Sequence, residues 1–453
     1  MENKNITERL AQFVADSRME DFPTEVIEAG KKCLLDWIGV AFGGMKDPSV
    51  KIMIDLIKEM GGKRQASLLG YGVKTNVLNA ALINGTMSHA LDYDDAHSGS
   101  RSHPSAPLIP AVLSVAEWRR QSGSEWIAAF IAGFEVSTRI GLILGKSYYE
   151  SGWHATSILG RFGAAAGAGR LLRLNERQLA TAFGLAATQA GGLRRVFGTM
   201  GKPFHAGKAA MDGILSASLS QRGFTAPEDV LDGKPSFLDM FFREGESIQT
   251  VEGLGKDWQV LKDCFKPYAA CLLTHPLMDG LIWIKNQYPI YPHLIEEVHL
   301  EVAPLCLSVT DNPSPKDGLE GKFSLYFCAA VAMLHGQGKN SLFTDEGVQD
   351  PLVKDLMGKI KARANPALKE TEANVKVRLK NGTEFSRDVS FPKGDPRNPL
   401  TFDEIEEKFR DLVQPLLPKK RMDQLVEMIH GLESLQDVGK LMKLCRFTRS
   451  RAG

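Results

Sequence analysis

Helical spacing of apolar residues, sustained over about half of the chain, is the feature that most limits the possible folds. From about Thr7 to about Gly223, apolar side chains recur at intervals of three and four residues, which places them on one face of each of a succession of helices. Alanine and glycine are concentrated in residues 163–169 and 184–192, and such small side chains let neighbouring helices approach closely. A run of helices this dense predicts an all-α domain.

The pattern changes to mixed strands and helices after about Cys264. Residues 297–303 alternate apolar and polar side chains, which is typical of a strand, and residues 373–391 indicate a hairpin. The hairpin turn falls at Asn381-Gly382, a pair preferred in type I′ turns. Between the strand and the hairpin, residues 322–334 have the pattern of an apolar helix.

Helical spacing returns from Thr401, and this last segment is expected to pack on the first helical region. We therefore predict a mainly α protein. Residues 1–262 and 395–453 would form a large, discontinuous all-helical domain, and residues 263–394 would form a smaller α+β domain. A cleft between two such domains is a common place for a ligand.

Charge, cysteine content and hydropathy exclude several classes of protein. The formal net charge of +1 argues against a nucleic-acid partner, because such proteins usually have a strongly basic face. The six cysteines form no CxxC pair, so neither structural zinc nor an iron–sulfur cluster is indicated. The N-terminal sequence lacks the features of a signal peptide, and the apolar residues 127–144 are interrupted by Glu135 and Arg139, which makes them too short and too polar to span a membrane. These features predict a reduced, cytoplasmic protein with no membrane partner.

One stretch combines acidic and basic side chains at high density. Residues 84–107 read NGTMSHALDYDDAHSGSRSHPSAP and hold Asp92, Asp94, Asp95, His89, His97, His103 and Arg101. The aspartates follow a predicted helix over residues 76–91, and the negative end of a helix dipole disfavours them there. A solvated loop with an acidic cap is the simpler explanation, but a local rule broken so densely is typical of functional sites.

Further polar clusters lie along the chain. His154 occupies a turn before a glycine-rich helix. Lys202 precedes Pro203, and because proline favours the first helical position, Lys202 would lie at a helix N-terminus that attracts anions. The remaining clusters hold His205, Lys266, Cys271, His275 and Lys322. A structural histidine, a solvated lysine and a buried cysteine remain the alternatives for these residues.

These residue types fit removal of a proton next to a carboxylate. That reaction needs a base and cations that hold the developing enolate charge, and histidines, lysines and helix N-termini supply both without a metal. The sequence has no P-loop, no GxSxG and no GxGxxG after a strand, so no nucleotide cofactor is expected. A hard-metal site is the alternative, formed by Asp92, Asp94, Asp95 and His97, but no second ligand group has a recognisable spacing. We therefore expect neither a metal nor a cofactor.

Five stretches, in order along nearly the whole chain, resemble the 2-methylcitrate dehydratase family (MmgE/PrpD), which includes cis-aconitate decarboxylase and iminodisuccinate epimerase. They are NGTMSHALDYDDAHSGSRSHPSAP, GWHATSILGRFGAAAGAGRLL, FGTMGKPFHAGKAAMDGILSA, KPYAACLLTHPLMDG and GKFSLYFCAAVAML. The resemblance implies a large helical domain, a smaller α+β lid, a homodimer and a cofactor-free site between the domains.

The same resemblance implies site residues. Those that match the decarboxylase branch are Asp92, His103, His154, Lys202 and Lys266. Two positions depart from that branch, since Cys271 stands where it has a histidine and Phe327 where it has a tyrosine. Tyr326 lies one position away and so on another face of the helix. Both departures weaken a decarboxylase assignment, and the cysteine-containing motif looks closer to the epimerase branch.

We therefore predict a lyase that dehydrates a 2-methylcitrate-like polycarboxylate, with His154 or Asp92 as the base. The residues expected to be catalytic are Asp92, His103, His154, Lys202 and Cys271, and those expected to bind substrate are Arg101, Lys266, His205 and His275. An epimerase of an imino- or amino-dicarboxylate is the first alternative, with Cys271 or a histidine as the acid on the opposite face. The further alternatives are a cis-aconitate decarboxylase and a non-catalytic polycarboxylate-binding protein.

Overall fold

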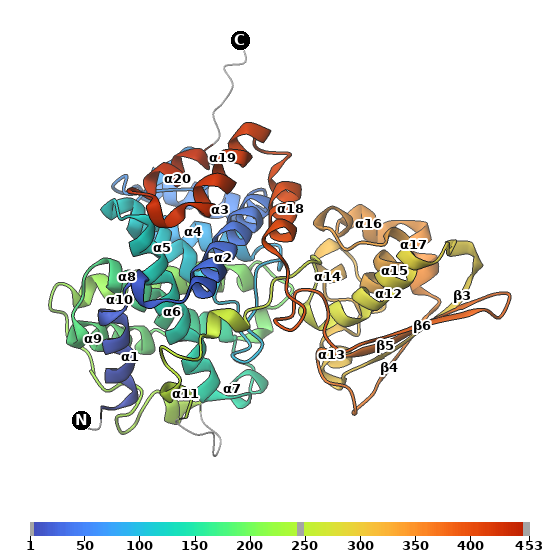
Figure 1. Cartoon of the computed structure of the whole chain (residues 1–453), viewed down its shortest axis with the longest axis horizontal. Helices are drawn as coiled ribbons and strands as arrows, with labels where there is room; N and C mark the ends of the chain where they lie inside the picture. The colour runs from blue at the N-terminus through green and yellow to red at the C-terminus, as the bar shows by residue number, and fades with distance from the viewer. Residues whose placement is uncertain (1–3, 242–248, 447–453) are drawn as a thin grey trace, which may run out of the picture. The chain divides into compact units, whose positions relative to one another are not determined.

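The computed structural model describes residues 4–241 and 249–446, which belong to two compact units (Figure 1). The first unit comprises Met1–Ala90, Asp94–Asp263 and Phe402–Gly453, and the second comprises Leu91–Tyr93 and Cys264–Thr401. Three limits differ from the predicted ones. The main segment of the second unit begins at Cys264 rather than at residue 263. The short segment Leu91–Tyr93 makes its contacts with the second unit, and the chain returns to the first unit at Phe402 rather than at residue 395.

The first unit is built from helices. Its longer helices are α1 (Ile6–Asp16), α2 (Thr24–Gly44), α3 (Pro48–Met60), α4 (Val77–His89), α5 (Ser105–Arg119), α6 (Gly123–Leu144), α8 (Ala155–Leu171), α9 (Glu176–Thr188), α10 (Gly201–Ser220), α18 (Phe402–Val413) and α19 (Lys419–His430). The shorter elements are α7 (Ser147–Glu150), α11 (Gln249–Glu252), α20 (Gly439–Leu444) and the two-residue strands β1 (Ala66–Ser67) and β2 (Lys74–Thr75). The helices predicted from about Thr7 to about Gly223 and from Thr401 onward are confirmed in the described part of this unit.

Helix α6 is a core helix of the first unit. It is 22 residues long and apolar enough to cross a membrane by length and composition, so the expectation that this stretch is too short was wrong. However, 94% of its most apolar window is buried inside the protein, where it packs against α8. The Nε atom of Arg139 donates to Glu135 Oε2 at 2.9 Å, so the two charges that interrupt the helix neutralise each other. A helix that is apolar all round is typical of a domain core.

Glycines let α10 approach both α4 and α8 closely. A Cβ atom on Gly85 of α4 would lie 2.7 Å from the Cα atom of Gly207 in α10, and a Cβ atom on Gly213 of α10 would lie 2.6 Å from the backbone nitrogen of Ala165 in α8. Real Cβ atoms are not found at such distances, so only glycine allows these backbones to cross where they do. These glycines therefore fix how closely α10 packs against α4 and α8.

The second unit contains a four-stranded sheet in the order β4-β3-β5-β6. Its strands are β3 (Ile295–Val302), β4 (Ile360–Ala364), β5 (Ala373–Leu379) and β6 (Glu384–Val389). Strand β3 pairs parallel with β4 and antiparallel with β5, and β5 and β6 form the predicted hairpin. One face of the sheet is covered by α12 (His275–Gln287), which in turn packs against α15 (Leu325–His335) (Figure 1). Strand β4 was not predicted from the sequence.

One local prediction in this unit was wrong, and one predicted helix starts later than expected. The hairpin turn is not type I′, because that turn needs positive φ at both central residues and only Gly382, at 86°, has it. The Oδ1 atom of Asn381 instead accepts from the backbone nitrogen of Thr383 at 3.0 Å. The helix expected over residues 322–334 is found as α15, but it begins at Leu325, where the side chain of Ser324 caps it, and the short α14 (Gly318–Gly321) precedes it.

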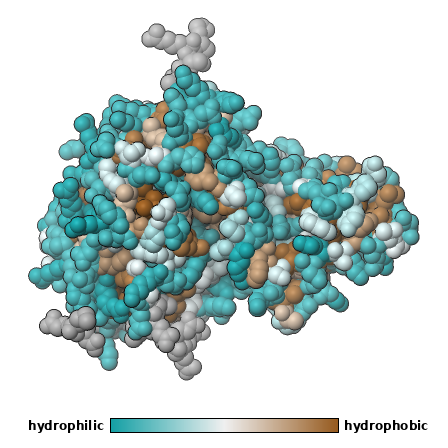
Figure 2. Space-filling model, viewed as in Figure 1, coloured by the Kyte–Doolittle hydropathy of each residue, from teal (hydrophilic) through white to brown (hydrophobic). Residues whose placement is uncertain are grey.

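Hydrophilic side chains cover most of the face drawn in Figure 2, and apolar groups on that face are small and separate. Scattered apolar groups of this kind are ordinary on a folded protein and need no functional explanation.

Candidate active site

The ends of three helices carry the polar cluster of the first unit. His89 is the last residue of α4, His154 immediately precedes α8, and Lys202 is the second residue of α10. The rings of His89 and His154 stack with their centroids 5.9 Å apart. Because α8 and α10 both begin here, the positive ends of two helix dipoles lie beside these side chains. The arrangement favours a bound anion.

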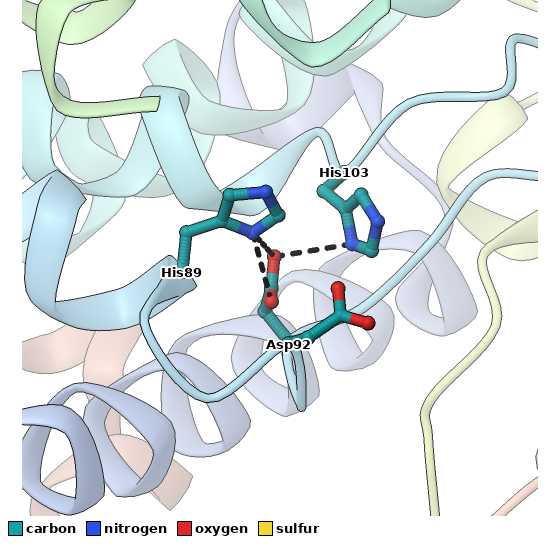
Figure 3. Close-up of side chains that lie close together, drawn as sticks. His89, Asp92 and His103 are labelled. Carbon is teal, nitrogen blue, oxygen red and sulfur yellow. Dashed lines mark hydrogen bonds and ion pairs between the residues drawn. The ribbon is translucent and has the colours of Figure 1, made fainter. Parts of the chain in front are cut away.

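Asp94 joins two histidines in this cluster. Its carboxylate oxygens lie 2.9 and 3.0 Å from His89 Nδ1, and one of them lies 3.2 Å from His103 Nδ1. The dashed lines in Figure 3 run from the two labelled histidines to this carboxylate, which carries no label there. His103 Nδ1 also donates to the backbone oxygen of Asp95 at 2.7 Å. Burial alone would raise the pKa of Asp94, but the two imidazoles outweigh burial and hold this pKa well below its usual range. Asp94 is therefore an ionised acceptor that orients both rings.

His154 and His205 are paired through their rings. The two Nδ1 atoms are 2.9 Å apart, so one ring must donate and the other accept. The side chain of His154 does not cap α8, and the ring packs edge-on against Phe197 with centroids 5.0 Å apart. Burial, followed by the charges of His89 and Lys202, holds the pKa of His154 well below its usual range. His154 is thus a neutral imidazole at neutral pH.

Lys202 is buried, with only 6% of its surface exposed. Its Nζ atom lies 5.2 Å from the centroid of the Phe197 ring, a cation–π contact. Burial and then the positive charge of Lys202 lower the pKa of His89 to about 4, although Asp94 opposes the shift. The structure therefore places His103, His154, His205 and Lys202 together with His89 and Asp94, and the helix N-terminus predicted for Lys202 is confirmed.

In the second unit, two buried lysines hold the segment Leu91–Tyr93. Lys266 Nζ donates to the backbone oxygen of Asp92 at 2.7 Å and lies 3.4 Å from the Asp92 carboxylate, while Lys322 Nζ donates to the backbone oxygen of Leu91 at 2.6 Å. Tyr93 Oη donates to the backbone oxygen of Pro267 at 2.8 Å. Asp92 has a φ of 52°, which a non-glycine residue adopts only when its surroundings enforce it. The contacts of Lys266 thus pair it with the Asp92 carboxylate.

The remaining expected site residues have less distinctive surroundings. The Arg101 guanidinium lies 5.6 Å from the ring of Tyr149 in the first unit. In the second unit, Cys271 is half-buried, and its backbone nitrogen donates to the oxygen of Lys322 at 2.9 Å. His275 is fully buried, and its Nε2 lies 3.3 Å from the backbone oxygen of Ala270, which is a structural contact.

Phe327, which stands where the decarboxylase branch has a tyrosine, lies in the hydrophobic core. Phe327 is fully buried against Phe343, with ring centroids 5.6 Å apart. Tyr326 Oη donates instead to Asp311 at 2.9 Å. The hydroxyl of Tyr326 therefore points to Asp311 and cannot stand in for a tyrosine hydroxyl at position 327. This agrees with the prediction that Tyr326 lies on another face of the helix.

Two sets of side chains in the first unit could offer ligand atoms to a cation. His89, Asp94 and His103 form one, and Cys33, Asp95 and Asp263 form the other, with ligand atoms within 4.8 Å of one another in each. The predicted alternative set is not brought together as a whole, because only Asp92 and Asp94 share a group, Asp95 falls in the other, and His97 is in neither and bonds to Ser100 at 3.0 Å. In the first group the carboxylate already receives hydrogen bonds from both imidazoles, an arrangement that needs no ion.

The sequence-based set of site residues omitted His89 and Asp94. Both were visible in the acidic and basic stretch, and His89 fell within the helix predicted over residues 76–91, near its C-terminal end. What singles them out is their mutual hydrogen bond five residues apart, which depends on how the chain turns after α4.

Comparison with known proteins agrees with this architecture. The MmgE/PrpD N-terminal domain matches residues 8–249, and the MmgE/PrpD C-terminal domain matches residues 268–433. The chain belongs to the MmgE/PrpD family. It is 26% identical to a cis-aconitate decarboxylase of Aspergillus terreus, over 97% of this chain and 95% of the relative. It is 25% identical to the cis-aconitate decarboxylase of Homo sapiens, over 98% of this chain and 95% of the relative. The resemblance that the sequence motifs indicated is thus confirmed.

Proposed function

We propose that this member of the MmgE/PrpD family is a cofactor-independent lyase that dehydrates a 2-methylcitrate-like polycarboxylate. The decarboxylase relatives support a lyase at the level of reaction class. The observation that carries the proposal is the buried charge of Lys202 beside the neutral ring of His154, where two helices begin.

The proposed reaction begins with binding of substrate carboxylates to Lys202 and to the N-termini of α8 and α10. His154 then removes the proton from the carbon next to a carboxylate, and the C–H electron pair moves into an enolate. Lys202 and the helix dipoles hold the enolate charge. The double bond forms as the C–O bond of the hydroxyl group breaks, and protonated His154 gives its proton to the leaving hydroxide, which departs as water. Substrate carboxylates would also offset the charge of Lys202, and so would raise the low proton affinity of His154 in the complex.

The choice of His154 over Asp92 follows from their partners. The Asp92 carboxylate lies 3.4 Å from the Lys266 ammonium, and an ion-paired carboxylate is a weak base. His154 is neutral, and its Nδ1 bond to His205 leaves the opposite ring nitrogen available. His103 and Arg101 would bind further carboxylates in this scheme. Lys266 keeps its expected role as a substrate-binding residue, and Cys271 keeps its expected role as a proton donor.

Decarboxylation of cis-aconitate is the second candidate, because the curated relatives carry that name. The buried Phe327 and the diverted hydroxyl of Tyr326 argue against it, since the decarboxylase branch has a tyrosine at this position. Epimerisation of an imino- or amino-dicarboxylate is the third candidate.

We further propose that the protein is a cytoplasmic homodimer with no nucleic-acid or membrane partner. Light scattering tests the dimer, and cell fractionation tests the location.

The test is incubation of the enzyme with 2-methylcitrate, citrate, cis-aconitate and aspartate-derived acids in heavy water. Loss of water from a hydroxy acid supports the proposal, whereas release of carbon dioxide from cis-aconitate supports the second candidate. Deuterium exchange next to a carboxylate without loss of water or carbon dioxide indicates an epimerase. Binding without any exchange indicates a non-catalytic protein.

A further inference from the structure

His89 has one ring nitrogen that no described residue pairs. Its Nδ1 faces the Asp94 carboxylate at 2.9 and 3.0 Å, and because an ionised carboxylate only accepts, Nδ1 must carry the proton. A neutral imidazole has a single N–H, so Nε2 is a bare acceptor. Within residues 4–241 and 249–446, this Nε2 is buried and has no hydrogen-bond partner. Figure 3 shows it on the side of the ring away from the carboxylate.

An orphaned buried acceptor needs an explanation, because most buried polar atoms in folded proteins are paired. His89 is only 1% exposed, yet its ring stacks on His154, the base of the proposed reaction. Asp94 fixes the orientation of the ring, so the bare nitrogen has a defined direction. The unpaired acceptor of His89 thus belongs to a ring that stacks on the proposed base.

We propose that His89 is a specificity-determining residue whose Nε2 accepts a hydrogen bond from the hydroxyl group of the substrate. This assignment rests on the proposed function and narrows it to hydroxy-polycarboxylates. An ionised polycarboxylate offers only acceptors through its carboxylates, and these suit Lys202 and the helix N-termini. The hydroxyl of a citrate-like acid is its one hydrogen-bond donor, whereas ionised cis-aconitate has none. The cationic and N–H groups of the site thus match the carboxylates of a hydroxy acid, and the bare Nε2 acceptor matches its hydroxyl donor.

The expected consequence is discrimination against an analogue that lacks the hydroxyl. A site built to pair a substrate hydroxyl rejects such an analogue strongly, because the buried acceptor is then left without a partner. We expect a preference of at least about tenfold.

Isothermal titration with citrate and propane-1,2,3-tricarboxylate measures this directly, since the two acids differ only by the hydroxyl. The wild-type protein should bind citrate at least about tenfold more tightly. His89→Leu should lose this preference and should bind propane-1,2,3-tricarboxylate within about threefold of wild type. His97→Gln is the matched control, because His97 is also buried but bonds to Ser100, and it should keep the preference.

A measurement on the unaltered protein guards against misfolding of the variant. In protein labelled with ¹⁵N-histidine, the His89 resonances should show a protonated Nδ1 and a bare Nε2. Citrate should shift the Nε2 resonance, and propane-1,2,3-tricarboxylate should not.

The possible failures are distinct. Equal binding of the two acids, a preference that survives His89→Leu, or a protonated Nε2 would each overturn the assignment of His89 and leave the lyase proposal in place. If neither acid bound and no polycarboxylate reacted, the proposed function itself would be refuted, and this assignment with it.

Discussion

The Nδ1 atom of His154 lies 2.9 Å from the Nδ1 atom of His205, a residue 51 positions further along the chain. Two neutral imidazoles joined in this way cannot both be protonated at the shared nitrogens. If His154 donates, its opposite nitrogen keeps a lone pair and can act as a base. His205 is half-buried, so its own outer N–H could be hydrated in this tautomer. The charge of Lys202 near His154 favours a lone pair over an N–H at the free nitrogen of His154.

The role of His205 can be tested by replacing its ring. His205→Asn offers an amide oxygen that can still accept from His154 Nδ1, whereas His205→Leu offers no acceptor. We expect turnover within about threefold of wild type for the asparagine variant and a loss of roughly tenfold for the leucine variant, which is the scale of one neutral hydrogen bond. Steady-state kinetics with thermal unfolding of both variants measures this. Equal activity of the two variants would make the histidine pair irrelevant to catalysis.

His154→Gln should abolish most proton transfer. A general base contributes on the order of 10²–10⁴ in rate, so we expect deuterium exchange to fall at least about a hundredfold. Glutamine keeps the approximate size of the side chain, and the thermal midpoint should stay near that of wild type. His97→Gln serves as the control with near-normal exchange. Normal exchange in a stable His154→Gln protein would transfer the role of base to another residue, while loss of folding would make His154 a core residue.

Replacing Lys202 should affect both binding and ionisation. Lys202→Met removes a charge-assisted hydrogen bond to the substrate, which corresponds to a loss of roughly ten- to hundredfold in kcat/KM. Because the charge of Lys202 lowers the pKa of His89, its removal should raise that pKa from about 4. Kinetics and an NMR titration of His89 report the two effects separately. Lys208→Met is the control on the same helix, since Lys208 pairs with Asp212 and should change kcat/KM by no more than about threefold.

The stability of the protein should fall in acid through His97. Burial, followed by the charge of Lys262, lowers the pKa of His97 to about 4 from an ordinary value of 6.5. The unfolded chain therefore binds a proton as pH falls below about 6.5, while the folded protein does not bind it until about pH 4. This difference costs up to about 3 kcal/mol of unfolding free energy over that window.

Urea unfolding at pH 7 and pH 4.5 measures the effect. His97→Phe removes the titrating group, so its stability, although lower at pH 7, should change less between the two pH values than that of wild type. An identical pH dependence in the two proteins would show that His97 titrates normally in the folded state.

Treatment with EDTA should leave activity unchanged. Asp94 receives hydrogen bonds from His89 and His103, and these contacts orient the carboxylate without an ion. Activity after dialysis against EDTA, together with metal analysis of the purified protein, provides the measurement. Loss of activity that one divalent cation restored would identify His89, Asp94 and His103 as metal ligands instead.

Local sequence was sufficient for most of the fold. The helical periodicity placed α8 and α10 within two residues of their ends, and the alternation of apolar residues placed the β5–β6 hairpin. The failures have local physical causes. Strand β4 has five residues and is mostly exposed. Its sequence IKARA does alternate, but two of its three apolar residues are alanines, which are depleted in strands and give only a weak strand signal. The side chain of Ser324 caps α15, so this helix begins at Leu325, three residues after the predicted start.

For the candidate site, the sequence by itself determined which residue types were present and the helix N-terminus that holds Lys202, because both depend on neighbours within a few positions. Only the tertiary structure decided which side chains these residues bond to. The bond between His154 and His205 and the hold of Lys266 on Asp92, 174 positions away, arise from contacts between distant segments. The bond between Asp94 and His89 depends on the turn that follows α4. Burial then set the ionisation of these groups, since the loss of water and the nearness of charges shift a pKa far more than adjacent sequence does.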